Sequence, residues 1–258
     1  MLPAPTRSFV KTGGAGDLPR LAAEASGLAA LRAAGSVRVP EVYACGMADG
    51  QARLEIEFLD LRGLDRASGA LLGRQLADLH RHVGTQYGFT EDNWIGGSPQ
   101  QNGWYQEWPR FFAERRLRPQ LQWARGKGMD RKLVEQGESL AERLAAFFVD
   151  YHPAPSLLHG DLWGGNASAL PDGTPVIFDP AVYYGDRETD VAMSELFGGF
   201  PDSFYAGYRA AWPLDSGYET RKTLYNLYHV LNHYKLFGAG YLNQARRMMD
   251  RLLAELRA

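Results

Sequence analysis

The most informative segment of this chain places three polar side chains beside apolar runs. Asp161 follows Leu157–Gly160, Asn166 comes five residues later, and Asp179 follows Val176–Phe178. In phosphoryl transfer from ATP, one carboxylate accepts the proton of the attacking hydroxyl, while an amide oxygen and a second carboxylate hold Mg²⁺ on the phosphates. The set predicts a kinase of small hydroxylated molecules, with Asp161 as base and Asn166 and Asp179 as metal ligands. The competing interpretation is that these residues cap turns.

Two charged residues near the N-terminus fit the same chemistry. Lys11 ends a short strand pattern, and Glu24 lies thirteen positions later in a helical pattern. Kinases hold the α- and β-phosphates with a strand lysine that pairs with a helix glutamate. The alternative is a solvated ion pair. Further on, where strands give way to helices, we expect a hinge at Glu57–Leu59, with backbone groups that bind adenine.

The elements that must position these residues are strands first and helices afterwards. Turn punctuation and alternation predict strands over Ser8–Lys11, Val37–Ala44 and Ala52–Leu59. Helical spacing predicts helices over Pro19–Ala34, Leu71–Val83, Tyr105–Leu117, Asp130–Asp150, Thr189–Leu196, Asp202–Trp212, Tyr218–Phe237 and Tyr241–Arg257. This order predicts an α+β fold with two lobes, a small sheet-rich lobe over residues 1–60 and a larger helical lobe over residues 61–258.

Composition and charge exclude several classes of protein. A net charge of −2 lacks the basic excess of a nucleic-acid-binding protein, and Arg115–Arg116 and Arg246–Arg247 are expected on solvated helix faces. Cys45 is the single cysteine, so no disulfide can form within the chain, and its apolar setting predicts a buried residue. The absence of a leader or of about 20 consecutive apolar residues predicts a cytoplasmic protein without a membrane partner.

Longer stretches resemble the fructosamine kinase family, which is related to aminoglycoside and choline phosphotransferases and has a protein-kinase-like fold. The matching stretches are Phe89–Gly96, Pro99–Trp104, Phe111–Leu117, His159–Asn166, Ile177–Glu188, Leu196–Phe200 and Tyr225–His229. The residues around Trp163 and the run Tyr183–Glu188 separate this family from its relatives. The resemblance covers nearly the whole chain from Phe9 onward.

The resemblance implies phosphorylation of ketoamines, which are sugar–amine adducts, on the 3-hydroxyl of the sugar, with ATP and Mg²⁺ as cofactors. The phosphorylated adduct then decomposes and frees the amine, as in the repair of glycated proteins. Bacterial-type members resemble ribulosamine or erythrulosamine kinases, and the substrate is a free or protein-bound ketoamine. Trp163 is placed to stack on the sugar or its linker, and the alternative is a core aromatic residue.

Two further features indicate a small acceptor rather than a peptide. Asp190 follows Asp179 by only eleven positions, which leaves little room for a peptide-docking segment. Gly160 stands where protein kinases have an arginine that pairs with a phosphorylated loop. Asp190 itself is expected to accept backbone hydrogen bonds from the catalytic loop, or else to cap a helix.

The N-terminus departs from the family pattern, in which a strand, a glycine-bearing phosphate loop and a second strand precede the lysine strand. Only eight residues precede Phe9, too few for two strands of about five or six residues each. Three explanations are open: a start that is too late, a natural short form with weaker ATP binding, or a protein without catalysis. We expect the first, because the residues for the chemistry are kept.

Two other functions and the assembly state stay open at this point. Within the same class, the alternative is an aminoglycoside- or choline-type phosphotransferase; outside it, the alternative is a non-catalytic nucleotide-binding pseudokinase. His80, His229 and His233 lie in helical segments without metal-ligand spacing and are expected to be structural. The chain is expected to be a monomer or a weak homodimer that pairs through an exposed sheet edge.

Overall fold

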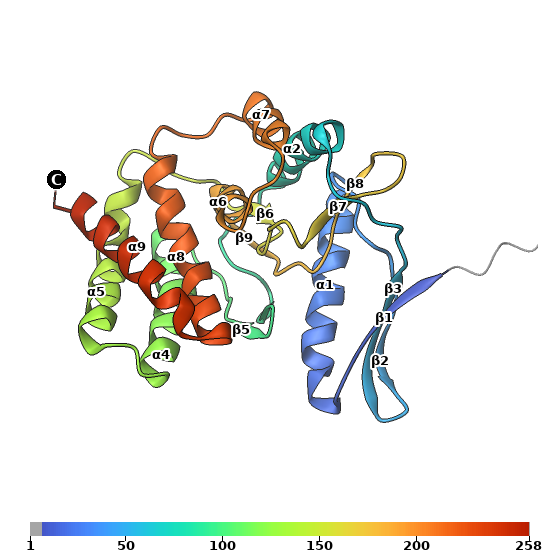
Figure 1. Cartoon of the computed structure of the whole chain (residues 1–258), viewed down its shortest axis with the longest axis horizontal. Helices are drawn as coiled ribbons and strands as arrows, with labels where there is room; N and C mark the ends of the chain where they lie inside the picture. The colour runs from blue at the N-terminus through green and yellow to red at the C-terminus, as the bar shows by residue number, and fades with distance from the viewer. Residues whose placement is uncertain (1–6, 258) are drawn as a thin grey trace, which may run out of the picture.

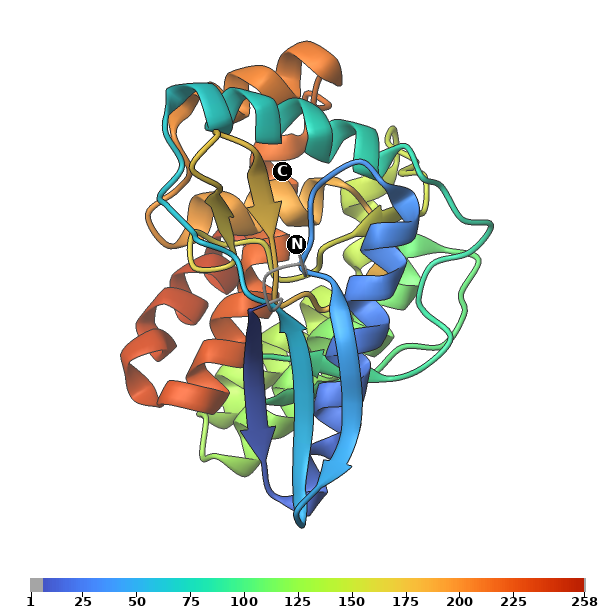
Figure 2. The same ribbon diagram turned by 90° about the vertical axis from the view of Figure 1, so that its right-hand side faces the viewer.

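The N-terminal part of the chain is an antiparallel sheet with one long helix against it (Figures 1 and 2). The computed structural model describes residues 7–257. The strand order is β1-β3-β2, with β1 at Ser8–Gly13, β2 at Val42–Ala48 and β3 at Gln51–Glu57. Of the eight residues before Phe9, Met1–Thr6 lie outside the described residues, so the expectation about the N-terminus is not tested.

Helix α1 (Leu18–Ala34) forms where the alanine- and leucine-rich pattern predicts a helix. Pro19 stands in its first turn, and Gly35 ends it with a left-handed φ of 68°, a conformation that glycine adopts at little cost. Its buried face includes Leu21, Leu28 and Leu31, which pack toward β2 and β3. The helix therefore has a fixed position beside the strand that carries Lys11.

The second strand begins later than predicted. Val37 and Val39 are buried, but β2 starts only at Val42, and Arg38 forms an isolated parallel bridge to Val176. Pro40 lies between them and has no N–H to donate to a sheet ladder. The segment 37–39 therefore links the N-terminal sheet to the part of the chain that precedes Asp179.

The rest of the chain is mainly helical and includes three short two-stranded ladders, of which β7–β8 (Ala167–Ala169 with Pro175–Ile177) lies beside α1 (Figure 1). The helices are α2 (Arg66–His80), α3 (Trp108–Phe112), α4 (Arg118–Gly126), α5 (Arg131–Glu142), α6 (Glu188–Leu196), α7 (Asp202–Ala211), α8 (Tyr218–Phe237) and α9 (Leu242–Glu255). Short 3₁₀ turns occupy Ala15–Asp17, Leu144–Phe148 and Ala239–Tyr241, and the π-helical segment Ala113–Leu117 joins α3 to α4. The predicted helix over 130–150 is wrong at its C-terminal end, because α5 stops at Glu142.

The short ladders position the polar loops. In these ladders β4 (Asn93–Ile95) pairs with β5 (Ser98–Gln100), β6 (Ser156–Leu158) with β9 (Tyr183–Gly185), and β7 (Ala167–Ala169) with β8 (Pro175–Ile177). The loop with Asp161 and Asn166 connects β6 to β7, and Asp179 lies just after β8. The three predicted catalytic residues therefore lie in two neighbouring loops.

Two side chains differ from their predicted exposure. Arg116 is fully buried: it donates to the Gln101 carbonyl and, at 2.8 Å, to Asn102 Oδ1. Its guanidinium also lies 4.1 Å from the centre of the Tyr183 ring, so a solvated face is wrong for this arginine. Cys45 is exposed rather than buried, because it lies on β2, an outer strand of the sheet.

These elements confirm an α+β fold with a small antiparallel sheet and a large helical part. A lobe boundary near residue 60 stays a prediction. Over residues 7–257, no helix is both long and apolar enough to cross a membrane.

Candidate active site

The loop that carries Asp161 is held by a buried carboxylate. Asp190, in the first turn of α6, accepts hydrogen bonds from the backbone N–H groups of His159 at 2.7 Å and of Gly160 at 2.8 Å. This confirms the prediction that Asp190 supports the catalytic loop. Because the two N–H groups precede Asp161 directly, they fix the backbone from which its side chain projects.

Gly160 occupies a position that only glycine fits without strain. Its φ is 83°, and a Cβ atom on it would lie 2.0 Å from the carbonyl oxygen of Ala181. Real Cβ atoms essentially never approach a carbonyl so closely. The close contact between the catalytic loop and the residue after Pro180 therefore gives a physical reason for the glycine at this position.

A second layer of buried polar groups supports Asp190. His80 of α2 lies with Nε2 3.2 Å from Asp190 Oδ2 and with Nδ1 2.8 Å from the hydroxyl of Tyr208. Burial lowers the pKa of His80, so the ring is neutral near pH 7. His80 is thus a structural histidine, as predicted.

Asp161 and Asn166 lie against one another across the loop. The Asn166 amide nitrogen donates to the Asp161 carbonyl at 2.9 Å and lies 3.4 Å from Asp161 Oδ2. It also lies 3.4 Å from the Asp179 carbonyl oxygen. Burial raises the pKa of Asp161 to about 7, and the negative charges of Asp190 and Asp179 add to this effect.

Lys11 joins the N-terminal sheet to this loop region. Its Nζ lies 2.7 Å from Glu24 Oε1 and also pairs with Asp179 Oδ1. Burial on its own would lower the pKa of Lys11, but the charges of Glu24 and Asp179 outweigh burial and raise it. Asp179 has a φ of 55°, which is rare for a residue with a side chain and is often found at functional sites.

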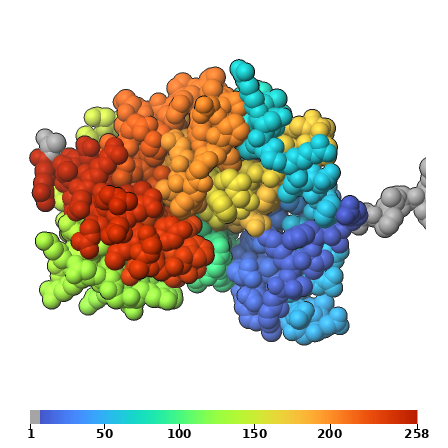
Figure 3. Space-filling view, viewed as in Figure 1, coloured from blue at the N-terminus to red at the C-terminus, as the bar shows by residue number. Residues whose placement is uncertain are grey.

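Two cavities meet at Lys11 and Asp179. The first, of about 310 Å³, contains Asp161, Trp163 and Asn166 and lies between α1 and α8. The second, of about 320 Å³, is mainly apolar; its remaining wall is Phe9, Pro40, Ile56, Glu57, Phe58, Leu59, Leu61 and Phe178. In Figure 3 the yellow segment that includes the catalytic loop lies between the blue N-terminal residues and the orange-to-red C-terminal helices.

The predicted hinge segment Glu57–Leu59 lines the apolar cavity, but two of its backbone N–H groups are already used. Glu57 donates its N–H to the Glu41 carbonyl at 2.8 Å, and its carboxylate pairs with Arg38. Phe58 donates its N–H to the Arg7 carbonyl at 3.1 Å. Glu57 and Leu59 lie in the cavity wall, but the N–H groups of Glu57 and Phe58 would not be available to adenine, and the hinge stays a prediction.

Trp163 lies in the wall of the first cavity with 39% of its surface exposed, so it is not a core residue. Gly165 makes room for it, because a Cβ on Gly165 would lie 2.3 Å from the indole ring. The same cavity has walls to which sequence reasoning assigned no role: Arg20, Asn93, Trp94, Asn232, His233, Leu236 and Phe237. The polar pair Asn232–His233 in the aromatic-rich helix α8 was the one signal that could have indicated them.

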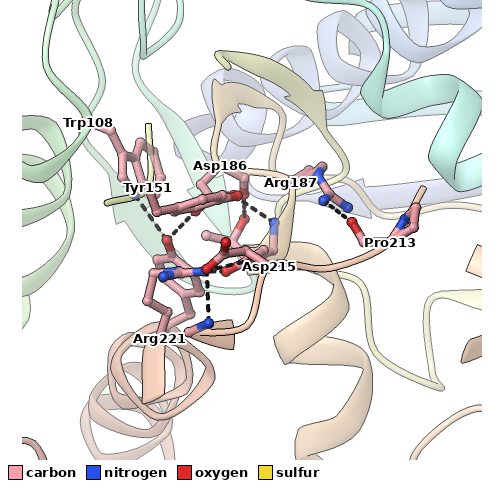
Figure 4. Close-up of polar contacts among 11 residues, drawn as sticks. Trp108, Tyr151, Asp186, Arg187, Pro213, Asp215 and Arg221 are labelled. Carbon is pink, nitrogen blue, oxygen red and sulfur yellow. Dashed lines mark hydrogen bonds and ion pairs between the residues drawn. The ribbon is translucent and has the colours of Figure 1, made fainter. Parts of the chain in front are cut away.

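A buried charge network joins α6, which carries Asp190, to α8 (Figure 4). Asp186 accepts hydrogen bonds from the hydroxyls of Tyr151, at 2.9 Å, and Tyr225. Arg221 lies 2.8 Å from Glu188 Oε2 and 2.7 Å from Asp215 Oδ1. Asp186 and Glu188, at the end of the run Tyr183–Glu188, therefore hold α6, which carries Asp190, against α8, which lines the first cavity.

Comparison with known proteins places the chain in a family. The model of the fructosamine kinase family matches residues 3–255. A probable ketoamine kinase of Vibrio cholerae is 45% identical over 250 residues, which are 96% of this chain and 85% of that protein. A chloroplastic protein-ribulosamine 3-kinase of Arabidopsis thaliana is 41% identical over 253 residues, 97% of this chain and 77% of the relative.

Solved structures of kinases are also similar to this chain. The crystal structure of a candidate fructosamine-3-kinase from Haemophilus somnus has a TM-score of 0.89 and 33% identity, covering 96% of this chain and 84% of the other. A choline kinase of Streptococcus pneumoniae, at 16% identity and a TM-score of 0.61 over 97% of this chain and 87% of its own, shares the fold. The chain therefore belongs to the fructosamine kinase family and is an ATP-using kinase with the protein-kinase-like fold that its sequence resembles.

Proposed function

We propose that this kinase transfers the γ-phosphoryl group of ATP to the 3-hydroxyl of ketoamines, with Asp161 as the catalytic base. The observation that carries the proposal is the meeting of the two cavities at Lys11 and Asp179. An apolar cavity on one side suits a nucleobase, and a polar cavity with a carboxylate on the other suits an acceptor. The phosphates then lie between them, where a lysine is already in place.

The residues of the apolar cavity and the Lys11–Glu24 ion pair provide a place for each part of the nucleotide. Adenine enters the apolar cavity between Phe9 and Phe178, beside the hinge segment Glu57–Leu59. Lys11 neutralises the α- and β-phosphates, and Glu24 holds the ammonium group in place at 2.7 Å. This ion pair joins β1 to α1, so both elements contribute to the phosphate site.

The donor set fits Mg²⁺. The Asn166 amide nitrogen is used in hydrogen bonds to Asp161 and Asp179, which directs the amide oxygen away from them and leaves it available to a cation. The Asp179 carboxylate supplies a second oxygen, and Mg²⁺ prefers few carboxylates combined with phosphate oxygens and water. Bound there, Mg²⁺ would neutralise the charge that develops on the phosphates.

Asp161 is placed to take the proton of the acceptor hydroxyl. With a pKa of about 7, its carboxylate is basic enough to accept a proton and is still largely ionised in mildly alkaline solution. Trp163 offers an aromatic face in the same cavity for the sugar or its linker. We propose that the ketoamine is carried either by a free amine or by a protein. That the protein is cytoplasmic, and that it is a monomer or a weak homodimer, stay predictions.

The test is Mg²⁺-dependent release of ADP from ATP with ribulose-lysine and fructose-lysine as acceptors. Asp161→Asn should lower turnover by about 10²- to 10⁴-fold, the usual contribution of a positioned base. Asp172→Asn is the matched control, because Asp172 is an exposed turn residue outside both cavities. Turnover of choline or an aminoglycoside but not of ketoamines would contradict the proposal, as would ATP binding without transfer to any acceptor.

A further inference from the structure

The last two turns of α8 present two adjacent polar side chains to the cavity that contains Asp161. Asn232 and His233 both line it, together with Leu236 and Phe237 from the same helix. Their neighbours on α8 are mostly buried aromatic and aliphatic residues. A polar pair at the cavity wall of such a helix has no role in the chemistry described above.

The hydrogen bond that His233 makes defines which of its ring nitrogens is left for a ligand. Its Nδ1 lies 2.8 Å from the backbone carbonyl oxygen of His229. A carbonyl can only accept, so Nδ1 carries the hydrogen, and in the neutral ring Nε2 is a bare acceptor. Burial lowers the pKa of His233, which keeps the ring neutral near pH 7. Among residues 7–257, no side-chain partner of Nε2 is found.

Three aromatic rings hold the imidazole in this orientation. The ring centres of Phe197, Phe237 and Tyr241 lie 4.5, 5.3 and 5.2 Å from that of His233. A side chain enclosed in this way loses little further freedom when a ligand binds, so a hydrogen bond to it costs less entropy. His233 is therefore a rigid acceptor.

Asn232 supplies the complementary group. Its side-chain oxygen accepts a hydrogen bond from Gln120 Nε2 at 3.4 Å, and the side chain is almost fully buried. The amide nitrogen, with two hydrogens, has no partner within the described part of the chain. The cavity wall has two other side-chain amides. The Asn166 nitrogen donates to the carbonyl oxygens of Asp161 and Asp179, and Asn93 is used at both ends, by Val182 O at 2.7 Å and by Gln100 Nε2 at 2.8 Å. Asn232 thus carries the amide nitrogen that can donate to a ligand.

We propose that Asn232 and His233 recognise the hydroxyl next to the one that is phosphorylated, the 4-hydroxyl of the sugar chain in a ketoamine. A hydroxyl both donates and accepts, so it can give its hydrogen to His233 Nε2 and accept one from the Asn232 amide. This assignment rests on the proposed function and adds the group that makes the enzyme specific for polyhydroxy acceptors. It also gives a reason why an acceptor with a single hydroxyl would bind poorly.

The experiment compares ribulose-lysine with its 4-deoxy analogue on wild type, His233→Phe and Asn232→Leu. Both turnover and binding by calorimetry are measured. Each variant should raise KM and Kd for ribulose-lysine about tenfold, because the 4-hydroxyl loses a partner in a desolvated site. Neither should weaken binding of the 4-deoxy analogue further, and KM for ATP should not change. His233→Gln should bind ribulose-lysine more tightly than His233→Phe, because the side-chain oxygen of glutamine is a hydrogen-bond acceptor.

Lys235→Gln is the matched control and should leave both affinities unchanged, since Lys235 lies in the same turns of α8 but contacts Trp123 and does not line the cavity. Equal losses for ribulose-lysine and the 4-deoxy analogue would overturn the assignment, and so would unchanged affinity for ribulose-lysine. If wild type binds ribulose-lysine without turnover, the proposed function fails, and the Kd values still test the pair alone. If wild type binds neither adduct, both the function and the pair are refuted.

Discussion

Replacing Gly160 by alanine tests whether the catalytic loop depends on its left-handed backbone and its close approach to Ala181. A φ of 83° costs a residue with a Cβ about 1–2 kcal/mol. The new Cβ would lie 2.0 Å from the Ala181 carbonyl oxygen, whereas ordinary contacts begin at 3.4 Å, so 3.4 − 2.0 = 1.4 Å of movement is needed. That movement disturbs two hydrogen bonds, from Ala181 N–H to His159 O and from Gln100 Nε2 to Ala181 O.

The sum of these effects is a loss of about 3–5 kcal/mol in the free energy of unfolding, from backbone strain, overpacking and weakened hydrogen bonds. Asp161 is the next residue, and a displacement of its carboxylate by about 1 Å would lower kcat by about 100-fold. Urea unfolding followed by tryptophan fluorescence measures the first quantity, and ADP release measures the second.

Gly164→Ala is the matched control, because Gly164 is in the same loop, has no left-handed φ, and a Cβ on it would meet no atom within 4 Å. Its stability should stay within about 0.5 kcal/mol of wild type. If Gly160→Ala were as stable as Gly164→Ala and equally active, the contact with Ala181 would not constrain the loop and the reasoning would be refuted.

Three more predictions follow from the same structure. Arg221→Met leaves Glu188 buried without its cation and should cost about 3–5 kcal/mol of unfolding free energy; adding Glu188→Gln should restore much of it, and an unchanged loss in the double variant would argue against the pairing. Burial lowers the pKa of His229 to about 3, so between about pH 6.5 and 3 this histidine is protonated only in the unfolded state. The free energy of unfolding therefore decreases as the pH is lowered through that window. By pH 4.5 the loss is about 2.7 kcal/mol; His229→Phe should remove this dependence in unfolding curves at pH 7.5 and 4.5, and equal slopes for both proteins would rule it out. Lys11→Met should raise KM for ATP about tenfold or more and leave KM for the acceptor unchanged in ADP-release assays; the opposite pattern would move Lys11 to the acceptor side.

The close placement of the predicted base and the two predicted metal ligands could be foreseen because it depends on local order. Asp161, Asn166 and Asp179 lie within one short stretch, between apolar strands that the sequence marks clearly. The backbone itself brings such residues together, as the contacts of Asn166 with Asp161 and Asp179 demonstrate. Helix α8 was also predicted with its observed bounds, since a glycine precedes it and another follows it.

Other features could not be predicted because they depend on distant parts of the chain. Arg116 was expected on a solvated face because it lies in a helical pattern with acidic neighbours. Instead, carbonyl and amide oxygens from the segment after β5 and the ring of Tyr183 enclose it. His233 was expected to be structural; only the packing of α8 against the rest of the molecule places it in the cavity wall. For Arg116 the local sequence holds no signal, and for His233 the one signal is the polar pair that it forms with Asn232 in an aromatic-rich helix.

The sequence by itself therefore determined which chemistry to expect, because the types and order of the side chains predict a base, two oxygen ligands for a metal and a lysine–glutamate pair. The tertiary structure decided which of these groups share a cavity and what faces them. Lys11 and Asp179 are 168 positions apart, and their contact exists only because the N-terminal sheet packs beside the catalytic loop. Side-chain chemistry is a local property, whereas the distance between remote residues depends on the packing of the whole chain.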